Sequence, residues 1–229
     1  MRATLLAGCI AGLLLAGCRQ AGPGPAMQTP ATDASNAILP PLDDAAQDPP
    51  PSRVPGPEAV WNGPLEHCRT GTGAVDACLA DAMRAGDASA AAIAVSERLR
   101  GRGEAGHVSA WEERDGVGVA TIGYPFRANT NHGTWLVDSR GRPTDVDSLA
   151  ESALSVPSIE AFRTSHPDAR AFAPAEFVER QALPEGGVRF IYATPLRTCH
   201  ACETLGHLKV AYDFDSSREF AGQQVLGIE

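Results

Sequence analysis

Two cysteines three positions apart, with a histidine between them, form the first group in this chain whose spacing suggests chemistry. They lie in the run Cys199-His200-Ala201-Cys202. Such a pair can shuttle electrons, hold a metal, anchor a haem or close a disulfide. A thioredoxin-like pair precedes a helix, but here Gly206 ends any helix after one turn and a strand pattern follows. Attachment of a c-type haem requires histidine at position 203, which is glutamate.

Zinc is the remaining alternative for this run, with His200 and His207 as further ligands. His200 lies inside the cysteine pair, where its geometry is poor, and no second pair of spaced ligands completes a site. We therefore predict a structural disulfide that holds the bend before a strand at 207–214. We expect no metal and no cofactor.

Four cysteines remain for the folded domain once Cys9 and Cys18 are assigned to the N-terminal segment considered below. An even number in an oxidising compartment indicates two disulfides, and three connectivities are possible. The local pairing requires no assumption about tertiary structure, whereas the crossed pairings would join the start of the domain to its end. We favour the local pairs, which are Cys68 with Cys78 and Cys199 with Cys202.

A polar loop at 123–135 is the second candidate site. Arg127, Asn129, Asn131 and His132 can bind a polar ligand or the backbone of a partner, and loops on rigid sheets often carry function. The structural alternative is that these residues supply turn conformations and bond to their own loop. The run resembles segments of uncharacterised bacterial envelope proteins, a resemblance that implies no activity.

Other motifs fail on their context. The run 101–106 matches G-x-G-x-x-G, but it follows a helix pattern where dinucleotide binding requires a preceding strand. The run 213–219 offers oxygen atoms as a calcium loop does, but it lacks the central glycine, and a hairpin turn explains it better. No pair of carboxylates has a spacing that suggests acid–base catalysis.

Two helices are predicted to open the domain, over 73–87 and 87–103, with Asp87 as the N-cap of the second. Cys78 falls on the first helix and Cys68 in the loop before it, so that a disulfide would constrain the unfolded chain by about 2–3 kcal/mol. The apolar faces consist of Val75, Leu79, Ala82 and Met83 in the first helix and of Ala92, Ile93 and Leu99 in the second.

Alternating apolar residues predict strands in the rest of the domain. Helical spacing returns over 147–169, where Pro157 suits a first helical turn and Pro167 marks the exit. The chain is therefore expected to fold as α+β, with an N-terminal helical hairpin followed by a mainly antiparallel β-sheet. The expected turns and strands are a hairpin at Asp115-Gly116, a turn at Arg140-Gly141, a hairpin at 184–187, and strands at 207–214 and 219–228.

The N-terminus predicts a signal peptide over 1–17. Arg2 is followed by an apolar run through Leu15 that is too short to span a membrane. The order ending in Leu15-Ala16-Gly17-Cys18 resembles the lipobox of bacterial lipoproteins, which implies cleavage before Cys18 and a lipid on its thiol. The residue after the cysteine is Arg19 and not aspartate, which resembles lipoproteins that are sorted to the outer membrane and not those kept in the inner membrane. The alternative is an ordinary signal peptide in which Cys18 is incidental.

Residues 18–57 are rich in proline, alanine and glycine, a composition that predicts a disordered tether. A single α+β periplasmic domain is expected over 58–229. The net charge is −9 and becomes −10 when Arg2 is lost with the signal; Lys209 is the only lysine. No basic stripe is present, so nucleic acid is not expected as a partner.

These features predict a lipid-anchored protein of the outer membrane that faces the periplasm and binds a protein or cell-wall partner without catalysis. One specific form is an inhibitor or immunity protein that blocks a basic wall hydrolase, because an acidic surface attracts basic proteins. The alternative is a periplasmic enzyme. It would be either a thiol–disulfide protein that uses Cys199 and Cys202 or a hydrolase that uses His132.

Overall fold

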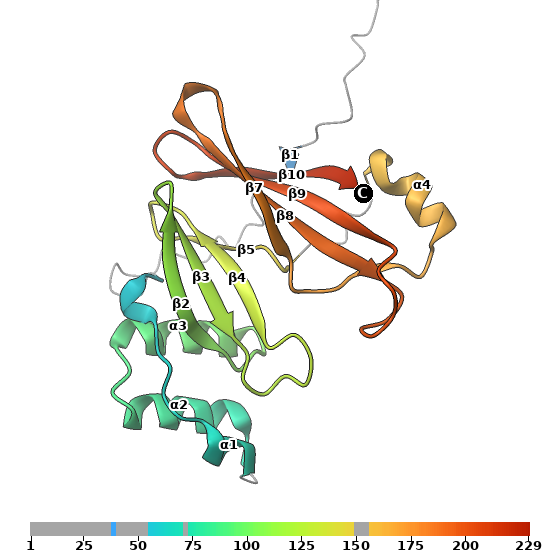
Figure 1. Ribbon diagram of the computed structural model, residues 1–229. Coiled ribbons are helices and arrows are strands. Elements are labelled where there is room, and N and C mark those ends of the chain that lie inside the picture. Colours follow the sequence, from blue (N-terminus) through green and yellow to red (C-terminus); the bar gives the residue numbers. More distant parts are fainter. Residues whose placement is uncertain (1–37, 40–54, 71–72, 149–155) are drawn as a thin grey trace, which may run out of the picture. The chain divides into compact units, whose positions relative to one another are not determined.

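The computed structural model describes residues 38–39, 55–70, 73–148 and 156–229 (Figure 1). Its helical elements are η3 (Pro57–Ala59), α1 (Glu66–Thr70), α2 (Val75–Ala85), α3 (Ala90–Gly101), α4 (Pro157–Ser165) and η5 (Pro184–Gly186). Its strands are β1 (Ile38–Leu39), β2 (His107–Arg114), β3 (Val117–Gly123), β4 (His132–Val137), β5 (Pro143–Asp145), β6 (Arg170–Ala171), β7 (Glu176–Ala182), β8 (Val188–Arg197), β9 (Gly206–Phe214) and β10 (Phe220–Ile228).

The described strands form two antiparallel sheets. The smaller sheet has the order β2-β3-β4-β5. The larger has the order β1-β10-β9-β8-β6, and β7 also pairs with β8. The predicted α+β class with antiparallel pairing is confirmed, but the strands divide between two sheets where one was expected.

The helical hairpin packs against the smaller sheet, as Figure 1 shows for α3, with α2 on the side of α3 away from the strands. Leu79, Ala82 and Met83 are buried as predicted, whereas Val75 is 41% exposed at the start of α2. Cys68 lies in the short helix α1 and not in a loop.

The predicted N-cap of the second helix is wrong. Asp87 lies in the turn between the helices with φ of 52°, and the Oγ of Ser89 accepts a hydrogen bond from the Ala92 N–H at 3.0 Å. The Ser89 hydroxyl also donates to the carbonyl oxygen of Glu58 at 2.5 Å, which ties the start of α3 to η3. This long-range bond favours serine over aspartate as the cap, because a carboxylate has no proton to donate.

The smaller sheet is built from hairpins. Asp115 and Gly116 have φ of 53° and 82°, as a two-residue type I′ turn requires, so the predicted hairpin is confirmed. β3 is buried on both faces: Val119 packs in the cluster shared with the larger sheet, and Ile122 packs against α3. The smaller sheet is therefore the middle layer between the helices and the larger sheet.

The larger sheet packs an aromatic core against the smaller one. Phe190, Tyr212 and Phe214 are at most 1% exposed, and they share a cluster with Leu136 of β4. α4 begins at Pro157 as predicted and buries Ile159 in the same cluster. The first part of the predicted helical run, 149–155, lies outside the described residues.

One element lies within the segment that composition predicts to be a disordered tether. β1 pairs antiparallel with β10, with Ile38 opposite Gln224 and Leu39 opposite Gln223. Pro55 and Gly56, which the prediction also placed in the tether, are buried. The signal segment 1–17 and Cys18 lie outside the described residues. None of the described helices is both long enough and apolar enough to cross a membrane.

Candidate functional site

A cavity of about 300 Å³ opens where the end of α3, the β3–β4 connection and the end of β5 meet. Most of its lining is polar or charged, with Leu99 and Ala173 as the aliphatic part. Arg127 and His132 of the predicted binding loop belong to it, so the structure brings half of that loop's candidates into one site. The lining residues are Leu99, Arg102, Glu104, Tyr124, Arg127, His132, Asp145, Asp147, Ser148 and Ala173.

The two asparagines of the predicted loop do not line this cavity. Asn129 is exposed, and Asn131 shapes the loop: its carbonyl oxygen accepts from the Tyr124 N–H at 2.7 Å. The Asn131 Oδ1 also lies 3.3 Å from Nδ1 of His132, on the exposed side of the loop. The structural interpretation of this loop therefore applies to Asn131.

Arg127 is held over the aromatic ring of Tyr124. The centre of its guanidinium group lies 3.7 Å from the ring centroid, which is a cation–π contact. Its Nη2 and Nε reach the two carboxylate oxygens of Glu104 at 2.6 and 3.2 Å. Burial raises the pKa of Tyr124 well above its usual value, so its ring is a neutral platform at physiological pH.

Replacement of Arg127 by alanine is expected to lower the free energy of unfolding by only about 1 kcal/mol, because the ion pair is partly exposed and the stacked ring remains packed. Urea denaturation measures the change. Arg84→Ala, which removes an exposed pair with Asp81, is the matched control and should cost about 0.5 kcal/mol or less. A loss above about 2 kcal/mol for Arg127→Ala would make this residue a structural clamp.

Two carboxylates form the opposite part of the lining. Asp145 ends β5, and Asp147 follows after Val146, which is fully buried. Oδ2 and Oδ1 of Asp147 accept hydrogen bonds from the N–H groups of Thr134 at 2.8 Å and Ala175 at 2.6 Å. Oδ1 of Asp145 accepts from the Asp147 N–H at 3.0 Å. Asp147 therefore braces the cavity, and hydrogen bonds from the Ser148 backbone and the Trp135 side chain also lower the pKa of Asp145.

Both carboxyl groups have raised pKa values. Burial is the main cause for each, and for Asp147 it outweighs the lowering effect of two backbone hydrogen bonds on the pKa. Attraction to Arg102 acts in the opposite direction on the pKa of Asp145, and attraction to His132 does so on the pKa of Asp147. The cavity therefore holds carboxylates and cationic side chains together.

This burial has a consequence for stability. Because the pKa of Asp145 is raised in the folded state, its ionised form lowers stability at neutral pH, and the penalty fades as pH falls through the folded pKa. Asp145→Asn is therefore expected to raise the free energy of unfolding at pH 7. The advantage should shrink as the pH approaches 3.8, the usual pKa of an aspartate. Denaturation at a series of pH values checks this, and a variant less stable than wild type at pH 7 contradicts it.

A buried donor lies beside Asp145. The Nε1 of Trp135, in a side chain that is 1% exposed, has no hydrogen-bond partner of normal geometry. The indole N–H faces the Asp145 carboxylate and lowers its pKa, without forming a regular hydrogen bond. The guanidinium group of Arg102 lies over the Trp135 ring, with its central carbon 5.8 Å from the ring centroid.

Gly133 explains the close approach of these groups. A Cβ atom at this position would lie 2.8 Å from Oδ2 of Asp147 and 3.1 Å from the Tyr124 ring. Only glycine therefore permits β4 to lie against both. Sequence reasoning missed Glu104, Tyr124, Asp145 and Asp147 as members of the site. The signal for the last two is Asp145-Val146-Asp147, in which alternation around a buried valine places both carboxylates on one face.

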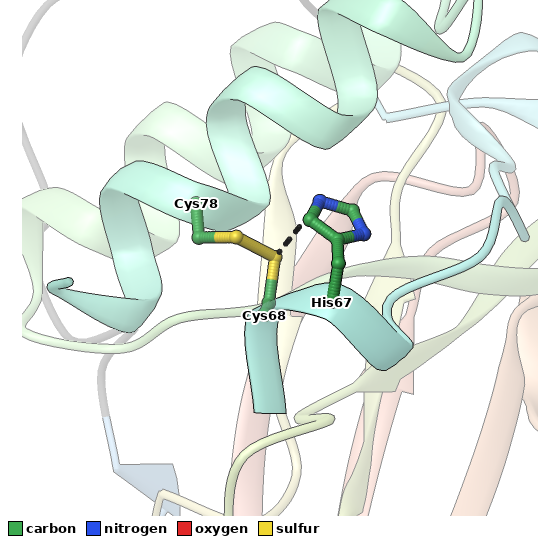
Figure 2. A group of neighbouring side chains, drawn as sticks. All are labelled: His67, Cys68 and Cys78. Carbon is green, nitrogen blue, oxygen red and sulfur yellow. Dashed lines mark hydrogen bonds between the residues drawn. A yellow bond between two sulfur atoms is a disulfide. The ribbon is translucent and has the colours of Figure 1, made fainter. Parts of the chain in front are cut away.

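The four domain cysteines pair locally, as predicted. Cys68 bonds to Cys78, and Cys199 bonds to Cys202. Figure 2 shows His67 beside the first disulfide, with Nε2 3.5 Å from Sγ of Cys68. These three residues bring metal-binding atom types within 4.8 Å of one another, but both sulfur atoms are bonded in the disulfide. No thiolate is therefore present for a metal.

The Cys199–Cys202 disulfide lies in the turn between β8 and β9. Arg197 closes the same turn, because its Nε donates to Oγ1 of Thr204 at 2.9 Å. His200 packs against Phe172 with ring centroids 4.9 Å apart. No helix begins at either cysteine, so the helix N-terminus that activates a thioredoxin-like thiol is absent from this described segment.

The run 213–219 forms the predicted hairpin turn. Asp213 is engaged by Arg189, whose Nε and Nη2 lie 2.6 and 2.7 Å from its two oxygens. Asp215 accepts from the N–H groups of Ser217 and Glu219 at 2.8 and 3.0 Å. These carboxylates are used within the fold, which agrees with a turn and not with a calcium loop.

Comparisons of the chain with protein-family models, with curated proteins and with solved structures gave no match.

Proposed function

We propose that this protein is a lipid-anchored envelope protein whose folded domain binds a ligand in the cavity between α3 and β5, without catalysis. The observation that carries the binding part is a mostly polar cavity of about 300 Å³ that contains the half-buried carboxylates of Asp145 and Asp147. Ligand sites are concave and combine apolar walls with a few polar groups that fix orientation. For its location, we propose a lipid on Cys18, sorting to the outer membrane and a domain that faces the periplasm. The support for this location is the sequence pattern of residues 2–19, in which a charge, an apolar run and Leu15-Ala16-Gly17-Cys18 follow one another.

An enzymatic function has less support in the described residues. A nucleophile and its base should lie within hydrogen-bonding reach, and none of the lining side chains forms such a pair. His132 bonds to Asn131 and not to a serine or carboxylate. Cys199 lies in a strand-to-strand turn, which gives its thiol no activating helix. The more specific proposal, inhibition of a basic wall hydrolase, agrees with the negative charge of the cavity.

The cavity proposal is tested by filling it. Ser148 is exposed and lines the opening, so Ser148→Trp places an indole there with little effect on the core. Wild-type and variant lipoprotein, immobilised in detergent, are incubated with envelope fractions separated by molecular mass. A component retained by wild type and lost with Ser148→Trp supports the proposal. Equal retention by Ser148→Trp and wild type overturns it.

The anchor is tested separately. Cys18→Ser should release the protein from the membrane fraction or leave it uncleaved, because stable anchoring requires more than one acyl chain. Fractionation of cells that express wild type or variant measures the change. A variant that stays with the outer membrane like wild type would show that the lipid on Cys18 is not the anchor.

A further inference from the structure

The two disulfides of the domain differ in their surroundings. Cys68 is 3% exposed and belongs to the apolar cluster of the helical hairpin, against which the half-buried Cys78 packs. Cys199 is exposed and Cys202 is half-buried, and neither belongs to an apolar cluster of the described residues. A thiolate must reach a sulfur atom of a disulfide in order to exchange with it. The Cys199–Cys202 disulfide is therefore the more accessible target.

The length of the closed loop also separates the two disulfides. Cys199 and Cys202 are three positions apart, whereas Cys68 and Cys78 are ten positions apart. A shorter loop removes less entropy from the unfolded chain, so the bond between Cys199 and Cys202 stabilises the fold less by this effect. Its reduction therefore costs the folded state less than reduction of the buried disulfide.

Hydrogen bonds close the turn between β8 and β9 without help from the disulfide. The Leu205 N–H donates to the carbonyl oxygen of Leu196 at 2.8 Å, which continues the pairing of the two strands. The guanidinium group of Arg197 donates to the carbonyl oxygen of His200 at 3.3 Å and to Oγ1 of Thr204 at 2.9 Å. The reduced turn therefore holds both thiols close together, and the disulfide can form again.

The charge of Arg197 favours reduction of this disulfide. Both acceptors that its guanidinium group binds in the turn are neutral oxygen atoms, so they do not cancel its charge. A nearby cation stabilises a thiolate, and a more stable thiolate leaves a disulfide faster. Glu203 carries the opposite charge, but its side chain is exposed, and solvent therefore screens it more than the half-buried Arg197.

We infer that the Cys199–Cys202 disulfide is a reversible redox site that a partner protein carrying a dithiol reduces, while the Cys68–Cys78 disulfide stays intact. A thiolate of the partner attacks Sγ of Cys199, the S–S bond breaks, and the electron pair leaves on Sγ of Cys202, which takes up a proton. The second thiol of the partner then displaces Cys199 from the mixed disulfide. The partner is oxidised to its disulfide, and two electrons and two protons pass to the cysteines.

This inference makes the domain the substrate of the exchange and not a thioredoxin-like enzyme, because no helix begins at either cysteine of the turn. It is independent of the ligand that the cavity binds. The Cys68–Cys78 disulfide is the matched control within the same molecule, so one sample compares an accessible and a buried disulfide under identical conditions.

The test uses the oxidised full-length protein in detergent, with dithiothreitol and reduced thioredoxin as the two probes. Samples are alkylated at intervals, and mass spectrometry of the peptides identifies the labelled cysteines. The Cys199–Cys202 disulfide should be reduced at least about tenfold faster than Cys68–Cys78 by both probes. Oxidised glutathione, added after the reductant is removed, should restore it. A thioredoxin variant with serine in place of its second active-site cysteine should be trapped on Cys199 as a mixed disulfide.

Three results would overturn the inference. The first is reduction of the two disulfides at equal rates, or of Cys68–Cys78 first. The second is reduction of Cys199–Cys202 by dithiothreitol and not by thioredoxin, which would show that a protein dithiol does not reach the turn. The third is failure of oxidised glutathione to restore the pair, which would show that the turn does not hold the two thiols together.

Discussion

Asp147→Ala is expected to lower the free energy of unfolding by about 3 kcal/mol, because hydrogen bonds to charged groups contribute about 1.5–3 kcal/mol each and two are lost. The carboxylate accepts from Thr134 on β4 and from Ala175 before β7, and so joins the two sheets beside the cavity. Loss of a partly buried charge recovers some of this energy, as the raised pKa of Asp147 indicates. The two unsatisfied N–H groups outweigh that gain. Urea denaturation measures the change.

Asp147→Asn separates the contribution of the hydrogen bonds from that of the buried charge. An asparagine retains one acceptor oxygen but opposes its NH₂ group to the other backbone N–H, so about half of the loss should remain. Asp168→Ala replaces an exposed aspartate and should fall within about 0.5 kcal/mol of wild type. If Asp147→Ala is no more destabilising than Asp168→Ala, the carboxylate does not brace the cavity.

Asp138→Ala is expected to cost about 4 kcal/mol, the largest effect of these substitutions, because its side chain is fully buried, accepts four hydrogen bonds and forms an ion pair with Arg142. Its Oδ1 accepts from the N–H groups of Arg140 and Arg142, both at 2.9 Å, and so closes the β4–β5 turn. Its Oδ2 accepts from Nε of Arg142 at 2.8 Å and from the Phe220 N–H at 3.4 Å. Thermal and urea denaturation measure the loss.

Arg142→Ala tests which of these bonds matter. The Arg142 side chain is 44% exposed, so removing it should cost about 1 kcal/mol or less if the backbone amides are the main partners of Asp138. Equal costs for Asp138→Ala and Arg142→Ala would mean that the ion pair, and not the turn, accounts for the effect.

Features that depend on neighbouring residues were predicted well. The Asp115-Gly116 turn needs two residues with positive φ, a requirement that this dipeptide meets by itself. Pro157 starts α4 because its fixed φ and missing N–H suit the first turn of a helix. Both disulfides close short spans, which need no knowledge of how distant segments pack.

Features that depend on distant contacts were missed. Asp87 and Ser89 are both acceptable caps locally, and only the hydrogen bond from Ser89 to Glu58 favours the serine. Composition predicts disorder around Ile38, but the free edge of β10 offers backbone groups with which this segment pairs. Alternation identifies hairpins, but it does not determine whether neighbouring hairpins join one sheet or two.

The sequence by itself determined the polar character of the loop at 123–135, and two of its four candidates, Arg127 and His132, do line the cavity. Tertiary structure alone decided that Glu104, which follows α3, and Asp145, at the end of β5, meet them there. Side-chain types and local spacing indicate which bonds and charges each residue can contribute. Which charges remain without a partner depends on segments far apart in the chain, because burial and Coulombic contact are properties of the packed fold.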